Sequence, residues 1–228
     1  MKRGCLVLAM FAAVCFVLPV PAHAQMGMDL FKPPAITKVF HPVIGKGAVY
    51  EDTTKDSKPR TMELSIVGKE TVDGKTAYWM QVYSNSEEGK TIVGKSLITP
   101  DDFQIHRMII QPPGQQAMEM PMHMNAAHQQ KMQDNFNDWH SVGTESITVP
   151  AGTFSCDHWH NDKTNADVWT SDKVVPFGMV KSVSPKGGTE LLVKTLDNAP
   201  DRITGPVKQF DMQEMMQQMQ QRRQQSPQ

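Results

Sequence analysis

Several motifs that mark common enzyme classes are missing from this sequence. There is no Gly-x-Ser-x-Gly nucleophile elbow, no His-Glu-x-x-His zinc motif and no Cys-x-x-Cys pair. Acids and bases that work together need not be close in sequence, so these absences do not exclude every enzyme. They favour a protein without catalytic activity, and we expect no catalytic residues.

Cysteine is scarce, with three residues in a chain of 228, and Cys5 and Cys15 lie near the N-terminus. Once that segment is removed, Cys156 is alone and cannot form a disulfide within the chain. We expect Cys156 to be a small buried hydrophobic residue. A reactive thiol or an intermolecular bridge is the alternative.

Only one long apolar run is present, from Cys5 to Val20, after the basic start Met1-Lys2-Arg3-Gly4. Ala22-His23-Ala24 follows with the small-x-small pattern of a cleavage site, which predicts a signal peptide over residues 1–24 and a mature start at Gln25. An uncleaved anchor is the alternative, but the run is short for a span of about 20 apolar residues. No other segment could cross a bilayer, so we expect an exported, periplasmic protein.

The chain also lacks a strong excess of charge of either sign. Removing Lys2 and Arg3 from the 23 basic residues leaves 21 against 24 acidic ones, a net charge of about −3. Nucleic-acid binding needs a basic surface, so this balance argues against a nucleic-acid partner. The mature chain of about 200 residues is long enough for one domain with a substantial core.

Short strands and turns dominate the rest of the chain. Alternating apolar and polar residues predict a half-buried strand over Arg60–Val67, and Asp73-Gly74 predicts a tight hairpin. The return strand, Thr76–Ser84, is apolar on both faces, so we expect it to be covered on both sides. The remaining strands are predicted over Gly45–Asp52, Thr91–Thr99, Phe103–Ile110, Thr144–Val149, Thr153–His160, Ala166–Thr170, Met179–Val183 and Thr189–Leu196.

About nine strands without intervening helices indicate a single antiparallel sheet that curls. We therefore predict a mainly β fold, with an extended lead-in over residues 25–44 and a half-barrel domain over residues 45–204. A short inserted helix is predicted over Asn125–Asn137. Residues 205–228 are predicted to form a Met- and Gln-rich amphipathic helix with a disordered tail.

The stretch Val149–Ser182 also carries a family resemblance. Its segments VPAGTF, Val168-Trp169-Thr170-Ser171 and VPFGMVKS occur in an order typical of a family of exported bacterial proteins. That family is usually grouped with the lipoprotein-carrier half-barrels of the LolA/LolB-like fold, and the resemblance spans His41–Pro206. It implies a curled half-barrel and, more weakly, a carrier or binding role, with no catalytic residues to transfer.

Methionine is abundant, and Met118, Met120, Met122 and Met124 alternate strictly. Strict alternation places all four thioethers on one face of a strand. An apolar lining is one interpretation, with Trp79 and Met80 of the two-faced strand as further ligand-binding residues. Because thioethers select Cu(I), a copper site using these four methionines and His123 is the alternative.

Two further patterns in the sequence bear on possible sites. Cys156, His158 and His160 share one strand face, but the first and third lie about 13 Å apart, too far for one ion, so we expect two solvated histidines. Near the C-terminus, helical spacing predicts an amphipathic helix that packs on its own domain, acts as a mobile plug or docks a partner. Its methionine face consists of Met212, Met215, Met216 and Met219.

These patterns favour a non-enzymatic periplasmic protein that holds apolar groups, such as a lipid acyl chain or a lipoprotein segment. We expect no cofactor in that case. The alternatives are a copper-binding protein and an interaction module that docks a periplasmic protein through its C-terminal helix.

Overall fold

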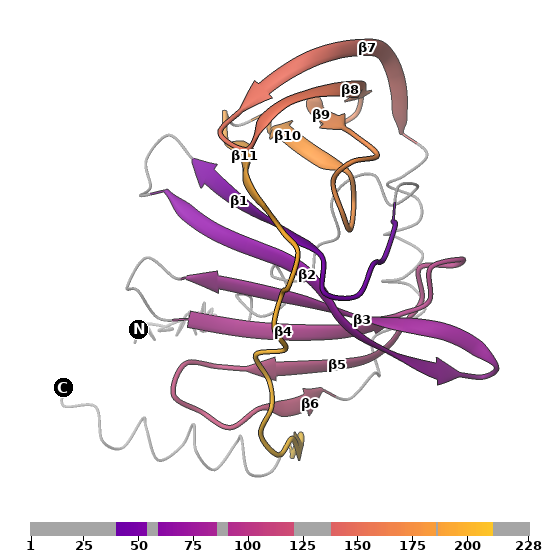
Figure 1. Cartoon of the computed structure of the whole chain (residues 1–228), viewed down its shortest axis with the longest axis vertical. Helices are drawn as coiled ribbons and strands as arrows, with labels where there is room; N and C mark the ends of the chain where they lie inside the picture. The colour runs from indigo at the N-terminus through magenta and orange to yellow at the C-terminus, as the bar shows by residue number, and fades with distance from the viewer. Residues whose placement is uncertain (1–39, 54–58, 86–90, 121–137, 186, 212–228) are drawn as a thin grey trace, which may run out of the picture.

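The computed structural model describes residues 40–53, 59–85, 91–120, 138–185 and 187–211. Within these ranges the chain forms twelve strands that belong to one sheet, drawn as arrows in Figure 1. No helix among the described residues has the length and apolar character needed to span a bilayer. The strands are β1 Gly47–Thr53, β2 Arg60–Val72, β3 Lys75–Asn85, β4 Thr91–Ile98, β5 Ile105–Gln111, β6 Met118–Met120, β7 Trp139–Val149, β8 Gly152–Asn161, β9 Ala166–Thr170, β10 Met179–Val183, β11 Thr189–Leu196 and β12 Lys208–Gln209.

The sheet consists of two meanders, a first one of strands β1–β6 and a second one of strands β7–β11, which meet where β1 pairs with β11. Its order is β12-β6-β5-β4-β3-β2-β1-β11-β10-β9-β8-β7, so β1 lies beside β11 rather than at an edge. All pairs are antiparallel except β12 with β6. The single curled sheet predicted from the alternating pattern is therefore confirmed, although it has more strands than the nine expected.

Local sequence explains the tightest turn of the first meander. Asp73 and Gly74 both have positive φ, at 50° and 78°, as a two-residue hairpin turn of type I′ requires. The hairpin pairs Val72 with Lys75, and the register holds to Met62 and Ser84 with one bulge. The predicted hairpin is confirmed, and both strands are longer than predicted.

Each strand of the first meander presents two different faces. One face, called here the core face, carries fully buried residues such as Tyr50, Ile66 and Val82. Three aromatic rings pack beside it: Phe40, Phe103 of the β4–β5 turn and Phe177 of the β9–β10 loop, with centroids 5.1 to 5.9 Å apart. These rings form a second contact between the two meanders, in addition to the pairing of β1 with β11.

The opposite face of the first meander is covered by residues 197–206, called here the strap. Gln81 donates to the Pro200 carbonyl at 3.0 Å, and the Arg202 amide donates back to Gln81 Oε1 at 2.8 Å. Ile203 completes a second apolar cluster with Trp79 and Leu97. Both faces of β3 are thus covered, as its two apolar faces predicted.

Other parts of the predicted fold differ or lie outside the described residues. Strand β7 starts at Trp139, five residues before the predicted start, and β12 was not predicted. Strand β6 is described only over Met118–Met120. The inserted helix and the C-terminal helix both fall outside the described residues.

Candidate functional site

Methionine side chains from three strands lie side by side on the core face. The register places Met80 of β3 opposite Ser96 of β4, Ser96 opposite Met108 of β5, and Met108 opposite Met120 of β6. Residues in direct register point to the same face of a sheet, with strands about 4.8 Å apart. Met118 lies two residues before Met120 on this same face, and we call the four methionines 80, 108, 118 and 120 the methionine face.

The middle strand of this face carries small residues. Gly94 pairs with Val82 and Ile110, and Ser96 lies between Met80 and Met108. The Ser96 hydroxyl is buried and has no hydrogen-bond partner among the described residues. A buried hydroxyl without a partner costs about 1–3 kcal/mol, so Ser96 makes this part of the sheet less stable.

The predicted ligand-binding residues divide between the two faces. Met80 and the pair Met118 and Met120 lie on the methionine face. Trp79 lies on the opposite face, where its Nε1 donates to Glu70 at 2.8 Å. The cationic groups of Lys95 and Arg107 lie 5.1 and 5.2 Å from the Trp79 ring. Sequence neighbours on a strand point to opposite faces, which separates Trp79 from Met80.

Several predicted site residues lie outside the described residues. These are Met122, His123, Met124, Met212, Met215, Met216 and Met219. The copper alternative and the docking helix therefore stay predictions. Within the described part of the chain, no group of three or more His, Cys, Asp or Glu side chains is arranged to hold a metal ion.

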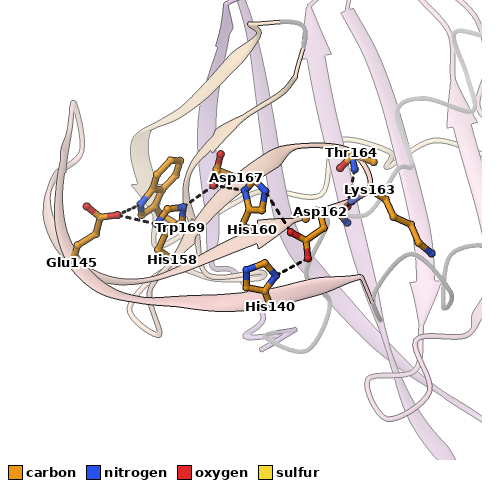
Figure 2. Close-up of polar contacts among 10 residues, drawn as sticks. His140, Glu145, His158, His160, Asp162, Lys163, Thr164, Asp167 and Trp169 are labelled. Atoms are coloured by element: carbon orange, nitrogen blue, oxygen red, sulfur yellow. Dashed lines mark hydrogen bonds and ion pairs between the residues drawn. The ribbon is translucent and has the colours of Figure 1, made fainter.

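Histidines and carboxylates alternate across β7, β8 and β9 (Figure 2). His158 Nδ1 lies 3.2 Å from Glu145 Oε1, and its Nε2 lies 2.8 Å from Asp167 Oδ1. The same Asp167 oxygen lies 2.9 Å from His160 Nδ1. Beyond it, Asp162 lies 3.9 Å from His160 Nε2 and 3.2 Å from His140 Nδ1.

The prediction that His158 and His160 are solvated is wrong. Their side chains are only 18% and 25% exposed, and both contact Asp167. The register explains the cluster, since His140, His160 and Asp167 are direct cross-strand neighbours. The sequence alone does not reveal these partners, because they depend on the register of β7 and β9 against β8.

Two pKa shifts accompany this cluster. Burial raises the pKa of the Asp167 carboxyl, but the hydrogen bonds from His160 and His158 outweigh it and leave the pKa below its usual value. Burial, together with the charges of Asp157 and Glu145, raises the pKa of the Cys156 thiol to about 11. Cys156 is 1% exposed, which confirms the predicted buried hydrophobic role.

A half-buried carboxyl group also lies on the core face, at Glu190 of β11. The register places it between Asp52 of β1 and Ser182 of β10, and the Ser182 hydroxyl lies 3.4 Å from Glu190 Oε2. Burial raises the pKa of Glu190 to about 7, and the charge of Asp52 adds to this shift. Burial likewise raises the pKa of the nearby Tyr50 phenol, whose hydroxyl donates to the Met179 carbonyl at 3.0 Å.

The sequence also contains one match to a phosphate-binding motif, although no phosphate-cradling glycine loop is expected in it. Residues 89–96, GKTIVGKS, fit the letters of the phosphate-binding loop Gly-x-x-x-x-Gly-Lys-Ser. That loop must open a helix, whereas Gly94, Lys95 and Ser96 lie inside strand β4. Lys95 is occupied by an ion pair to Asp201 at 2.6 Å. The match is therefore no phosphate site.

Comparison with known proteins gives structural neighbours at low similarity. No family model and no curated protein matches the sequence. A candidate lipoprotein from Parabacteroides distasonis ATCC 8503 is 15% identical, with a TM-score of 0.38, over 69% of this chain and 98% of its own. A candidate exported protein with a YmcC-like fold from Bacteroides fragilis NCTC 9343 is 14% identical, with a TM-score of 0.38 and the same two coverages.

A structure of MucB in complex with MucA(peri) is 8% identical, with a TM-score of 0.40, over 71% of this chain and 53% of that chain. This chain thus spans about half the length of MucB. Likeness at this level identifies no ligand for the present chain. The resemblance to the carrier half-barrels stays a prediction at the family level.

Proposed function

We propose that the protein is a non-enzymatic exported binding protein that holds apolar groups against the methionine face. The observation that carries this proposal is the row Met80, Ser96, Met108, Met120 across four strands. Thioether side chains are flexible and polarizable, so they adapt to apolar ligands of different shapes. Met80, Ser96 and Met108 are buried, so the half-buried Met118 and Met120 of β6 are the part of the methionine face that a ligand would contact first.

The ligand class that fits this face is an acyl chain or an apolar peptide segment. An apolar surface with few polar groups is typical of ligand sites in proteins. Export, and hence access to lipids and lipoproteins outside the cytoplasm, rests on the predicted signal peptide. Cu(I) binding through thioethers is the competing function, since Met118 and Met120 also belong to the predicted copper set.

The first experiment determines what the protein binds. The mature exported protein is purified and examined by native mass spectrometry and by titration with a fluorescent fatty acid. We expect a co-purified lipid mass and saturable binding of the probe. A protein that carries no lipid and does not bind the probe would contradict the proposal, and a copper mass in its place would favour the competing function.

Substitution of Met118 and Met120 separates the two functions. Leucine at both positions keeps the apolar volume, so folding should survive with a loss below about 1.5 kcal/mol per site, and probe binding should remain. Asparagine at both positions should weaken probe binding by tenfold or more. Each amide covered by an acyl chain would lack a hydrogen-bond partner, and a buried amide without a partner costs about 1–3 kcal/mol. Val142→Asn, at an exposed position on β7, is the matched control. Loss of binding in the leucine variant would contradict the proposal.

A further inference from the structure

We propose that the alternating histidines and carboxylates of β7–β9 form a proton-dependent clasp that holds the edge strand β7 against β8 and β9. The clasp consists of Glu145, His158, Asp167, His160, Asp162 and His140. In the protonated state the clasp is closed. Loss of protons from its imidazoles opens the contacts and loosens β7. This inference is independent of apolar binding on the methionine face.

His158 sets the protonation requirement. Its two ring nitrogens lie 3.2 and 2.8 Å from carboxylate oxygens of Glu145 and Asp167. The contact with Asp167 is a hydrogen bond, whereas the contact with Glu145 is an ion-pair distance. A neutral imidazole carries one N–H and no charge, so it can bond to Asp167 but does not form an ion pair with Glu145. Only the doubly protonated, charged ring is attracted to both carboxylates.

Two carboxylates and an aromatic face surround the His158 ring. The ring stacks on Trp169 with centroids 4.4 Å apart and an angle of 17°, which suits a cation on an aromatic face. Lys181 of β10, a like charge, lies 4.5 Å from the centroid of the same indole. The carboxylates that contact the ring are Glu145 of β7 and Asp167 of β9. The other titratable groups of the clasp are His140 of β7, His160 of β8 and Asp162. Cys156 and Asp157 precede His158 on β8, and Lys163, next to Asp162 in sequence, pairs with Asp138.

Strand β7 depends on this clasp because it lies at the edge of the sheet. It pairs only with β8, and residues 140–146 are exposed. A bulge between Ser141 and Gly143 interrupts the ladder within that stretch. Glu145, in the middle of β7, accepts a hydrogen bond from Trp169 Nε1 at 2.6 Å and lies within ion-pair distance of His158. His140 holds its start through Asp162.

The direction of the pH response follows from these charges. The Asp167 carboxyl stays ionised to a lower pH than usual, so its contacts persist when the solution becomes acidic. Histidine side chains gain their charge between about pH 8 and pH 5. A histidine stabilised in its charged form contributes stability at low pH and loses it as the pH rises. The clasp should therefore tighten as pH falls through this range.

Hydrogen exchange of the full chain tests the clasp. The amides of β7 should be roughly tenfold better protected at about pH 5.5 than at about pH 8, after correction for intrinsic exchange. His158→Gln should abolish this difference. His106→Gln is the matched control, since His106 contacts Thr99 and lies outside the clasp. Protection of β7 that does not change with pH, or that both variants abolish, would overturn the proposal.

A second measurement keeps the test decisive if His158→Gln does not fold. Nuclear magnetic resonance of the wild-type imidazoles counts the hydrogens on each ring nitrogen. We expect both nitrogens of His158 to carry a hydrogen under the conditions in which β7 is protected. Glu145→Gln, which keeps the acceptor for Trp169 but removes the charge, should reduce the pH dependence. A singly protonated His158 in the protected state rules out the clasp.

Discussion

Glu190 shows how a single residue can oppose folding at neutral pH. It is half-buried on the core face, where loss of solvent disfavours the charged carboxylate, and its acidic neighbour Asp52 adds repulsion. The Ser182 hydroxyl at 3.4 Å is the one hydrogen bond described for it. A desolvated carboxylate with such weak compensation favours its protonated form. Folding therefore retains a proton that the unfolded chain would release.

The stability of the protein should consequently fall between about pH 4.5 and pH 7. The pKa of Glu190 is raised from 4.5 to about 7, so over this window the folded state binds a proton that the unfolded state does not. Stability then decreases with rising pH, by up to about 3 kcal/mol. Glu190→Gln should remove most of this decrease and stabilise the protein at neutral pH. Urea unfolding of both proteins across the window measures it, and parallel curves would refute the assignment to Glu190.

Gly47 is required by a close approach between β1 and β2. A Cβ atom at this position would lie 2.5 Å from the Leu64 carbonyl oxygen and 2.8 Å from Ser65 Cβ. Since the nearest of these atoms belongs to the backbone, Gly47→Ala must displace a strand and should cost about 1–3 kcal/mol. Gly205→Ala is the control, because a Cβ there meets nothing within 4 Å. Thermal unfolding compares the two, and equal melting temperatures would contradict the steric explanation.

At the residue scale, the sequence predicted what depends on local pattern. The burial of Cys156 and the common face of Met118 and Met120 followed from composition and period two. The acidity of Asp167 and the burial of Glu190 depend on strands that are adjacent in space but distant in sequence. No local pattern contains that register, so these residues could not be identified.

Among the elements, the strap contributes through one ion pair in particular. Arg202 Nη2 lies 2.8 Å from Glu63 Oε2, and the Glu63 residue is only 8% exposed. The guanidinium also lies 3.8 Å from the centre of the Tyr83 ring. The pair therefore joins the strap to β2 and β3 at a site that excludes most solvent.

Arg202→Met should destabilise the protein by about 1–3 kcal/mol, because it keeps the apolar stem but leaves Glu63 buried without its partner. The double variant Arg202→Met with Glu63→Gln should recover part of the loss. Asp197→Asn breaks an exposed pair with Lys46 and should cause no resolvable change. Chemical denaturation measures all three. If the destabilisation of the double variant equals the sum of the destabilisations of the two single variants, the buried-charge explanation is refuted.

The elements that sequence predicted best are those with clear alternation or a strong turn. Ala166–Thr170, Met179–Val183 and Thr189–Leu196 match their strands at both ends. The strap has no periodic pattern, because its residues bind through backbone carbonyls and single side chains. The early part of β7 was missed for a similar reason, since an exposed edge strand has no apolar face to produce alternation.

For the whole molecule, the predicted export can be checked by intact mass. The mature protein should begin at Gln25, with residues 1–24 removed. The measurement is mass spectrometry of the protein recovered from the periplasm. A chain that retains Cys15, with or without a lipid, would contradict the prediction of a soluble exported protein.

The pairing of β1 with β11 has a kinetic consequence. Gly47 pairs with Leu196, so roughly 150 residues separate the two strands that join the meanders. Closing so long a loop costs entropy before any contact repays it, and chains rich in such distant contacts fold in milliseconds to seconds. A chain that emerges N-terminus first cannot complete its sheet until β11 has appeared. Until then, the backbone groups of β1 that later pair with β11 can pair with any extended chain nearby. A chaperone that covers these groups would therefore raise the yield of folded protein.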